Sequence, residues 1–259
     1  MTVEPGSVFE VPIAIETDHE FFTRFASDTE AAAYVGDLVA FTSTVFESEA
    51  SARLRITYLS LWETSNDPWE TACRGSEFGL YWNQNNTSID RALAHFLSGS
   101  ANAYGWAWRG VLCRGAFETT VSVEDARACG LPQKDMYGGD YGISSGLNFT
   151  FDLNDPGMLW DIYVFLHELG HNFDSRHTHC YAGVGGSASP VDGCYAGQSG
   201  CYSGDETLPG VGSLTGGVSG QGAGTLMSYC HFRAGSYGNI GMTFGRHHPG
   251  GYRRAVCPG

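Results

Sequence analysis

The chain contains 259 residues, with 14 Lys and Arg against 28 Asp and Glu, so its formal net charge is −14. This charge argues against nucleic acid as a partner, because affinity for phosphate backbones depends on clustered Lys and Arg side chains. Hydrophobic residues make up 42% of the chain and aromatic residues 13%, which excludes an unfolded chain. The length fits one large domain, or two small ones around a shared cleft.

Strands and one long helix are predicted in the N-terminal part of the chain. Apolar residues recur at helical spacing over residues 29–49, and a short helix is expected shortly after residue 80. Residues 63–79 are rich in turn-forming residues. Strands are expected over residues 8–15, 53–62, 92–97, 106–113 and 141–148.

The pattern changes from Asp155 onward. Asp155 is a good N-cap and Pro156 a good first helical residue, and leucines and isoleucine then recur on one face up to Phe173. We predict a buried helix here. Residues 183–224 are crowded with Gly and Ser and contain Cys194 and Cys201, which predicts irregular loops held by disulfides.

The eight cysteines form no CxxC pair, and an even number favours disulfides over a cysteine-only metal site. Local closures would join Cys194 to Cys201 or Cys113 to Cys129, with the other connectivities left open, and Cys257 is expected to anchor the C-terminal end. Disulfides indicate an oxidising, extracellular compartment and a secreted protein.

Neither a signal peptide nor a membrane span is expected within this chain. Residues 1–6 contain no basic n-region and no apolar h-region. The longest apolar stretch, residues 158–169, is interrupted by Asp161, His167 and Glu168.

The predicted buried helix contains the sequence His-Glu-Leu-Gly-His at residues 167–171. Residues four apart share one helix face, so His167 and His171 can present both imidazoles to one metal ion. Glu168 lies beside them, where its carboxylate can take a proton from a water on the metal. An unliganded His-Glu-His trio would be costly to bury, and this favours zinc over ordinary packing.

A catalytic zinc has three protein ligands and one open position, so a third ligand is needed. His177 is too far along to reach back unless the chain turns sharply near Asp174. Asp tolerates the left-handed backbone of such a turn. In an alternative, Asp174 stays on the helix and supplies the third ligand itself, which leaves His177 free.

Residues 167–177, His-Glu-x-x-His-x-x-Asp-x-x-His, resemble the HExxHxxGxxH signature of the metzincin zinc proteases, with Asp174 where the family usually has glycine. Residues 225–230, Thr-Leu-Met-Ser-Tyr-Cys, resemble the Met-turn of that superfamily. Within it, His-Glu-Leu-Gly-His-Asn-Phe is most similar to the adamalysin/reprolysin branch of peptidase family M12, and residues 90–99 and 105–113 resemble the third and fourth strands of that branch.

The resemblance implies an α/β (α+β) metzincin-like fold in a single catalytic domain, residues 1–259. Its upper subdomain, residues 1–173, would hold a five-stranded mixed sheet, long helices and the active-site helix. Its lower, irregular subdomain, residues 174–259, would be held by disulfides and contain the third zinc ligand and the Met-turn. The resemblance also implies that the strand near residues 106–113 is a sheet edge, where Ala107, Trp108, Arg109 and Gly110 could pair with an extended substrate.

Met227 and Tyr229 gain candidate roles from the same resemblance. Met227 would form a floor beneath the zinc without binding it, whereas by residue type alone it would be a core methionine. Tyr229 resembles the tyrosine that stabilises an oxyanion in the astacin and serralysin branches, and buried packing is the alternative. The cluster Asp152-x-Asn154-Asp155 is a candidate calcium site, although helix capping explains Asp155 without an ion.

These features predict a secreted, monomeric zinc endopeptidase that cleaves protein or peptide substrates. Zinc would be held by His167, His171 and His177, with Glu168 as the general base. The acidic surface would weakly favour basic or neutral substrates. The alternatives are a metzincin of the astacin or serralysin type, and a zinc-containing adhesive domain that is weakly active or inactive.

Overall fold

The computed structural model describes residues 8–69, 72–152, 154–184, 187–209 and 224–245. Cys257, which was expected to anchor the C-terminal end, lies outside these ranges. No helix within them is long and apolar enough to cross a membrane.

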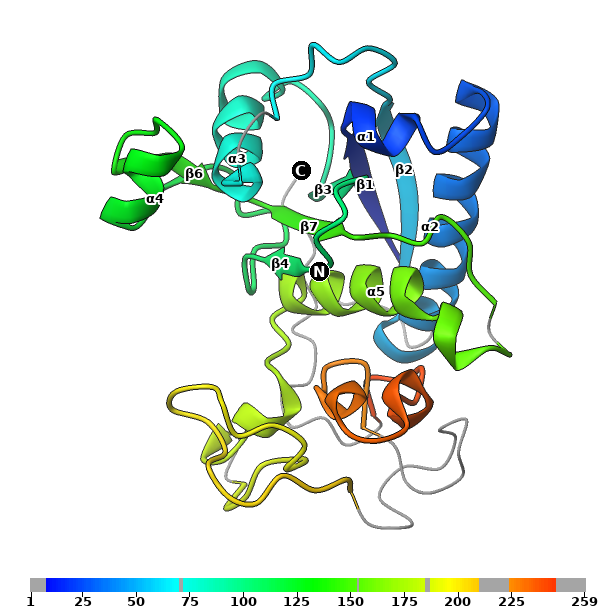
Figure 1. The fold of residues 1–259 in the computed structure, drawn as a ribbon, viewed down its shortest axis with the longest axis vertical. Helices are drawn as coiled ribbons and strands as arrows, with labels where there is room; N and C mark the ends of the chain where they lie inside the picture. Colours follow the sequence, from blue (N-terminus) through cyan, green and yellow to red (C-terminus); the bar gives the residue numbers. More distant parts are fainter. Residues whose placement is uncertain (1–7, 70–71, 153, 185–186, 210–223, 246–259) are drawn as a thin grey trace.

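A five-stranded mixed sheet forms the centre of the upper part, as the family resemblance implied (Figure 1). Its spatial order is β2-β1-β3-β7-β4, in which β4 at one edge is antiparallel to β7 and the other neighbouring strands are parallel. The strands are β1 (Phe9–Thr17), β2 (Ala52–Ser60), β3 (Leu93–Ser98), β4 (Gly105–Ala107) and β7 (Tyr141–Ser145).

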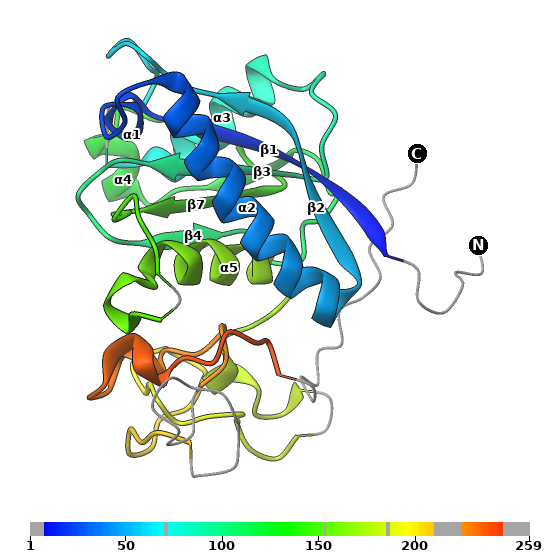
Figure 2. The ribbon, with the colours of Figure 1, turned by 90° about the vertical axis from the view of Figure 1, so that its right-hand side faces the viewer.

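Helices cover both faces of the sheet. The long helix α2 (Asp28–Ala50) and the site helix α5 (Trp160–Asn172) lie on one face, and Figure 2 shows α2 crossing in front of the strands. On that face the core continues below α5 to Met227 and Phe244. Helix α3 (Arg74–Asn85) covers the other face with an aromatic core of Trp69, Phe78, Trp82 and Phe96. Helix α5 is therefore packed between the sheet and the irregular residues below it.

The short elements were not predicted because they lack a sustained apolar period. They are helices α1 (His19–Phe22) and α4 (Val123–Ala128), the hairpin of β5 (Phe117–Thr120) and β6 (Lys134–Gly138), and the 3-10 turns η1 (Pro156–Met158), η2 (Thr178–Cys180), η4 (Cys230–Phe232) and η5 (Ser236–Asn239).

Three predicted boundaries were wrong. Helix α3 begins at Arg74, inside the stretch interpreted as turns. The strand expected over residues 106–113 ends at Ala107, because the chain then leaves β7 and its amides at Gly110 and Val111 donate to carbonyls at the end of α5. Asp155 does cap a helix, but that helix is the short turn η1, and α5 begins separately at Trp160.

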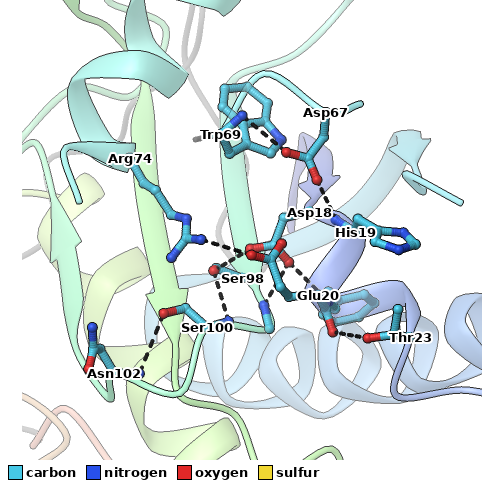
Figure 3. A network of polar contacts seen from close by, with 12 residues as sticks. Asp18, His19, Glu20, Thr23, Asp67, Trp69, Arg74, Ser98, Ser100 and Asn102 are labelled. Carbon is cyan, nitrogen blue, oxygen red and sulfur yellow. Dashed lines mark hydrogen bonds and ion pairs between the residues drawn. The ribbon is translucent and has the colours of Figure 1, made fainter. Parts of the chain in front are cut away.

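A buried carboxylate joins the ends of β1 and β3 (Figure 3). Asp18 accepts hydrogen bonds from the amides of Phe21 at 2.7 Å and Gly99 at 2.8 Å, and from the Ser98 hydroxyl. Burial raises the pKa of Asp18, and these donors partly offset that rise. The network fixes α1 against the end of the sheet at which β1 and β3 terminate.

The disulfides of the described residues are Cys73–Cys129, Cys180–Cys201 and Cys194–Cys230, with Cα–Cα distances of 6.2, 4.4 and 4.9 Å. The local closures Cys194–Cys201 and Cys113–Cys129 were therefore wrong. In both cases the true partner is further away in the sequence. Cys194 pairs with Cys230, at the end of the predicted Met-turn. Cys129 at the end of α4 pairs with Cys73 at the start of α3.

Candidate zinc site

Helix α5 ends at a left-handed residue, as the turn hypothesis required. Asp174 has φ 76°, its amide donates to the His171 carbonyl at 2.8 Å, and the Ser175 amide donates to the Gly170 carbonyl at 2.9 Å. These two bonds form a Schellman cap, in which the left-handed residue is usually glycine. Three residues later the chain has turned back, and His177 faces the helix that it has just left.

The nitrogens of three histidines converge at this point. The Nε2 atom of His177 lies 3.1 Å from the Nε2 atoms of both His167 and His171. All three ligand atoms lie within 4.8 Å of one another. Asp174 does not belong to this group, because its carboxylate points to Arg109, with Oδ1 3.6 Å from Nε.

The hydrogen bonds on the far side of each ring define which nitrogen carries the proton. His167 Nδ1 lies 2.7 Å from the Leu226 carbonyl and His171 Nδ1 lies 2.8 Å from the Ser175 carbonyl. A carbonyl can only accept, so these Nδ1 atoms donate and the Nε2 atoms present lone pairs. His177 Nδ1 is held in the same way by Gln198 Oε1 at 2.8 Å.

This donor set fits a zinc ion. Lone pairs on nitrogens 3.1 Å apart repel one another unless a cation lies between them. Tetrahedral zinc with Zn–N bonds of about 2.05 Å separates its ligand nitrogens by about 3.3 Å, close to the distance from His177 Nε2 to each of the other two nitrogens. The two other clusters of possible ligands in the described residues each include a cysteine that is already in a disulfide.

Burial keeps the three imidazoles neutral, which is the form that binds a metal. Desolvation is the main cause in each case. It lowers the pKa of His171 to about 4 and of His177 to about 3, and that of His167 well below its ordinary value. The charge of Arg109 adds to the lowering at His171.

Glu168 lies beside this cluster and against the edge strand. A Cβ atom added at Gly105 of β4 would sit 2.2 Å from Glu168 Oε1, so the carboxylate occupies space that only a glycine leaves open. Burial raises the pKa of Glu168 well above its ordinary value. Its Oε2 atom has no hydrogen-bond partner among the described residues.

Met227 lies under the helix, fully buried. A Cβ atom at Gly170 would meet the Met227 sulfur at 2.4 Å, so the glycine between Glu168 and His171 permits the close contact. The Met227 carbonyl accepts the Thr178 amide at 3.0 Å, which ties the segment after His177 to the same turn.

The Tyr229 ring contacts two histidines of the cluster. Its centroid lies 4.4 Å from that of His177 and 5.8 Å from that of His167, with the latter ring nearly parallel. Burial, followed by the nearby charge of Glu168, raises the pKa of Tyr229 to about 12. The phenol is therefore protonated at neutral pH and can donate a hydrogen bond.

The predicted edge residues have different positions. Ala107 is the last residue of β4, and Trp108 follows it with its amide bonded to the Tyr141 carbonyl of β7 at 3.1 Å. Backbone groups alternate in direction along a strand, so those of Gly105 and Ala107 face away from β7. Arg109 is half exposed and pairs with Asp174, and Gly110 has φ 66° with its amide on the His171 carbonyl.

Among the described residues 152, 154 and 155, nothing supports a calcium ion. Asp152 Oδ1 accepts bonds from the amide and side chain of Asn154, and Asp155 Oδ1 accepts the Gly157 amide at 2.8 Å. These oxygens stabilise turns in an exposed loop.

Sequence reasoning missed two residues that shape the site. Gly105 carried a usable signal, since a glycine at a predicted strand indicates a close approach. Gln198 carried none. It lies in a Gly and Ser-rich loop closed by Cys180–Cys201, and its Oε1 atom contacts both His177 and His179, the latter at 2.7 Å.

The model of the family described as Metallo-peptidase family M12 matches residues 9–236. A search of curated protein sequences gave no match. A solved structure described as a chaperone–substrate complex is similar at 14% identity with a TM-score of 0.41, covering 66% of this chain and 25% of that chain. The crystal structure of metalloproteinase-II from Bacteroides fragilis is similar at 13% identity with a TM-score of 0.37, covering 70% and 47%. The chain thus spans about a quarter and about half of these two chains.

The surroundings of Gly170 in α5 and Gly36 in α2 predict that replacement by alanine changes the free energy of unfolding in opposite directions. Gly170→Ala should lower the free energy of unfolding by about 1–3 kcal/mol, because the new methyl group overlaps the Met227 sulfur. Gly36→Ala in α2 is the matched control, since nothing lies within 4 Å of its added carbon. It should raise the free energy by about 0.5–1 kcal/mol. Urea unfolding in the presence of a chelator measures both, and equal effects would contradict the packing argument.

The cap at Asp174 predicts a ranking of variants. Asp174→Gly should keep its zinc, because glycine adopts a positive φ freely and the exposed Arg109 pair contributes little. Asp174→Val should lose stability by about 1–2 kcal/mol and bind zinc less well, since its side chain strains that backbone. His177→Ala should lose the metal. Zinc content after dialysis, measured by mass spectrometry, decides the matter: loss from Asp174→Gly with retention in His177→Ala would make Asp174 the ligand.

Proposed function

This chain belongs to metallopeptidase family M12, and we propose that it is a secreted zinc endopeptidase of the metzincin type, from the adamalysin/reprolysin branch. The family implies zinc and peptide or protein substrates. The proposal assigns the metal to His167, His171 and His177. Its main support is that three Nε2 lone pairs converge while each Nδ1 is bonded outward.

The remaining roles follow from the positions around this centre. Bound zinc would polarise the scissile carbonyl and make a water molecule more acidic. Glu168 would take a proton from the attacking water and pass it to the leaving amine. The Tyr229 phenol would donate a hydrogen bond to the oxyanion that develops on the carbonyl. The outward backbone groups of Gly105 and Ala107 would hold the substrate as an added strand.

We further propose that residues 1–259 act as one monomeric catalytic domain, with an upper subdomain of residues 1–173 and a lower subdomain of residues 174–259. Disulfides on both sides of the site fit an extracellular protein. Met227 would support the site from below without touching the metal, as its burial under Gly170 suggests.

Two alternatives are each favoured by one observation. The ring contacts of Tyr229 would suit a metzincin of the astacin or serralysin type. The low exposure of the site would suit a zinc-containing adhesive domain without activity, in which the metal serves stability. Glu168 argues against the second alternative, because a purely structural site needs no buried carboxylate beside an open coordination position.

Replacing the proposed base tests the function directly. Glu168→Gln should keep about one zinc per chain but lower the cleavage of denatured casein by about 10²–10⁴-fold, since the ligands remain while the proton acceptor is lost. Glu63→Gln, at an exposed loop position, is the matched control and should cleave normally. A chelator should abolish the activity of the unmodified chain and of Glu63→Gln. Full turnover by Glu168→Gln, or by the chelated chain, would refute the mechanism.

Replacing the phenol separates catalysis from packing at Tyr229. If the hydroxyl donates to the oxyanion, Tyr229→Phe should lower kcat by about 10²-fold or more with little change in KM. Tyr58→Phe on β2, at the opposite edge of the sheet, serves as the control. Steady-state kinetics on one peptide gives both constants, and an unchanged kcat would leave Tyr229 as a packing residue.

A further inference from the structure

A hollow of about 370 Å³ opens beside the histidine cluster of the candidate zinc site. Its lining includes Ala107 and Arg109 from the edge, His171 and His177 from the cluster, and Arg176 and Gln198 from the segment beyond the cap. A void of this size accommodates one amino-acid side chain with part of its backbone. Because two of the proposed metal ligands form its wall, whatever fills it adjoins the bond to be cleaved.

The charge of this hollow is opposite to that of the molecule. The chain has 28 acidic residues against 14 basic ones, yet the lining contains two arginines and no Asp or Glu. Such a local reversal matters because charges beyond about 8 Å are screened at physiological salt. A ligand inside the hollow therefore meets the two arginines, together with Asp174, whose carboxylate lies 3.6 Å from Arg109 Nε. Acidic residues more than about 8 Å away affect it little.

Both arginines have donors available for a ligand. Arg176 is exposed, and the structure gives its side chain no ion pair in the described ranges. Arg109 reaches Asp174 through Nε at 3.6 Å, with both side chains about half exposed (41% and 55%), so the pair is weak. A guanidinium has five N–H donors, and this contact leaves the terminal nitrogens of Arg109 for a second carboxylate.

The position along β4 indicates which part of a substrate would enter. Glu168 lies against Gly105 at the start of β4, whereas the hollow lies at Ala107 and Arg109 beyond its end. A peptide added antiparallel to β4, the commoner pairing, runs from the Arg109 end toward the Gly105 end. Its residues on the N-terminal side of the scissile bond would then lie over the hollow.

We propose that this hollow is a specificity subsite for an acidic side chain, Asp or Glu, on the N-terminal side of the scissile bond, bound by Arg176 and Arg109. The inference rests on the proposed endopeptidase function and names a class of substrate for it. It also reverses the simple expectation from net charge that basic or neutral substrates are favoured.

The test uses the zinc-loaded full chain and capped peptides with an amidated C-terminus, so that no terminal carboxylate competes. Each position on either side of the cleaved bond is varied in turn among Glu, Gln and Lys. We expect kcat/KM to favour Glu over Gln by about tenfold at one position on the N-terminal side only. Arg176→Gln should reduce that ratio to about one, and Arg176→Glu should shift the preference to Lys. Arg55→Gln on β2 is the matched control and should keep the ratio of the unmodified chain.

A binding measurement distinguishes failure of the subsite proposal from failure of the proposed endopeptidase function. The Kd of the Glu and Gln peptides is measured by fluorescence anisotropy on zinc-loaded Glu168→Gln, with and without Arg176→Gln. The expected result is about tenfold tighter binding of the Glu peptide, lost with Arg176. Cleavage or binding without discrimination, or discrimination that survives both Arg176→Gln and Arg109→Gln, would overturn the subsite alone. If no peptide binds and none is cut, the endopeptidase function fails and the subsite fails with it.

Discussion

The site depends on one backbone reversal, the left-handed residue Asp174 at the end of α5. A helix can place two histidines on one face by itself, but a third nitrogen at 3.1 Å from both requires the chain to double back within three residues. The same residue positions the neighbours of the site. Its carboxylate lies 3.6 Å from Arg109 Nε, and the His171 carbonyl, which accepts the Asp174 amide, also accepts the amide of Gly110. Ligands, cap and sheet edge thus share a few bonds at the end of one helix.

Segments distant in the sequence complete the site from below. The Leu226 carbonyl orients His167 from 59 residues away, and Gln198 orients His177 from within a disulfide-closed loop. Groups of this kind fix ring orientation and proton position, and their loss commonly weakens metal binding. Metal binding at the proposed site would therefore depend on the folding of the lower part, although that part has few regular elements.

Local sequence patterns predict much of this arrangement, but some of its features depend on contacts between distant parts of the chain. The helices α2 and α5, the strands β1 and β2 and the turn at Asp174 could be predicted from local patterns, and the family resemblance implied the five-stranded mixed sheet. Disulfide pairing could not, because it depends on where loops without period return in space. The short length of β4 could not be predicted for a related reason. Residues 108–111 have the pattern of a strand, but the amides of Gly110 and Val111 bond to carbonyls at the end of α5. The roles of Gln198 and Arg176 could not be predicted either, because they depend on residues that only the fold brings next to them.

The three-residue length of β4 has a consequence for the proteins on which such an enzyme would act. An edge this short, beside the proposed general base Glu168 with its 5% exposure, can be reached only by a backbone that is itself extended and detached from its own secondary structure. Helices and paired strands in a target must first open locally, and the free energy of that opening differs widely from place to place in one protein. Which bonds are cut, and how fast, would then depend on the local stability of the target as much as on its sequence.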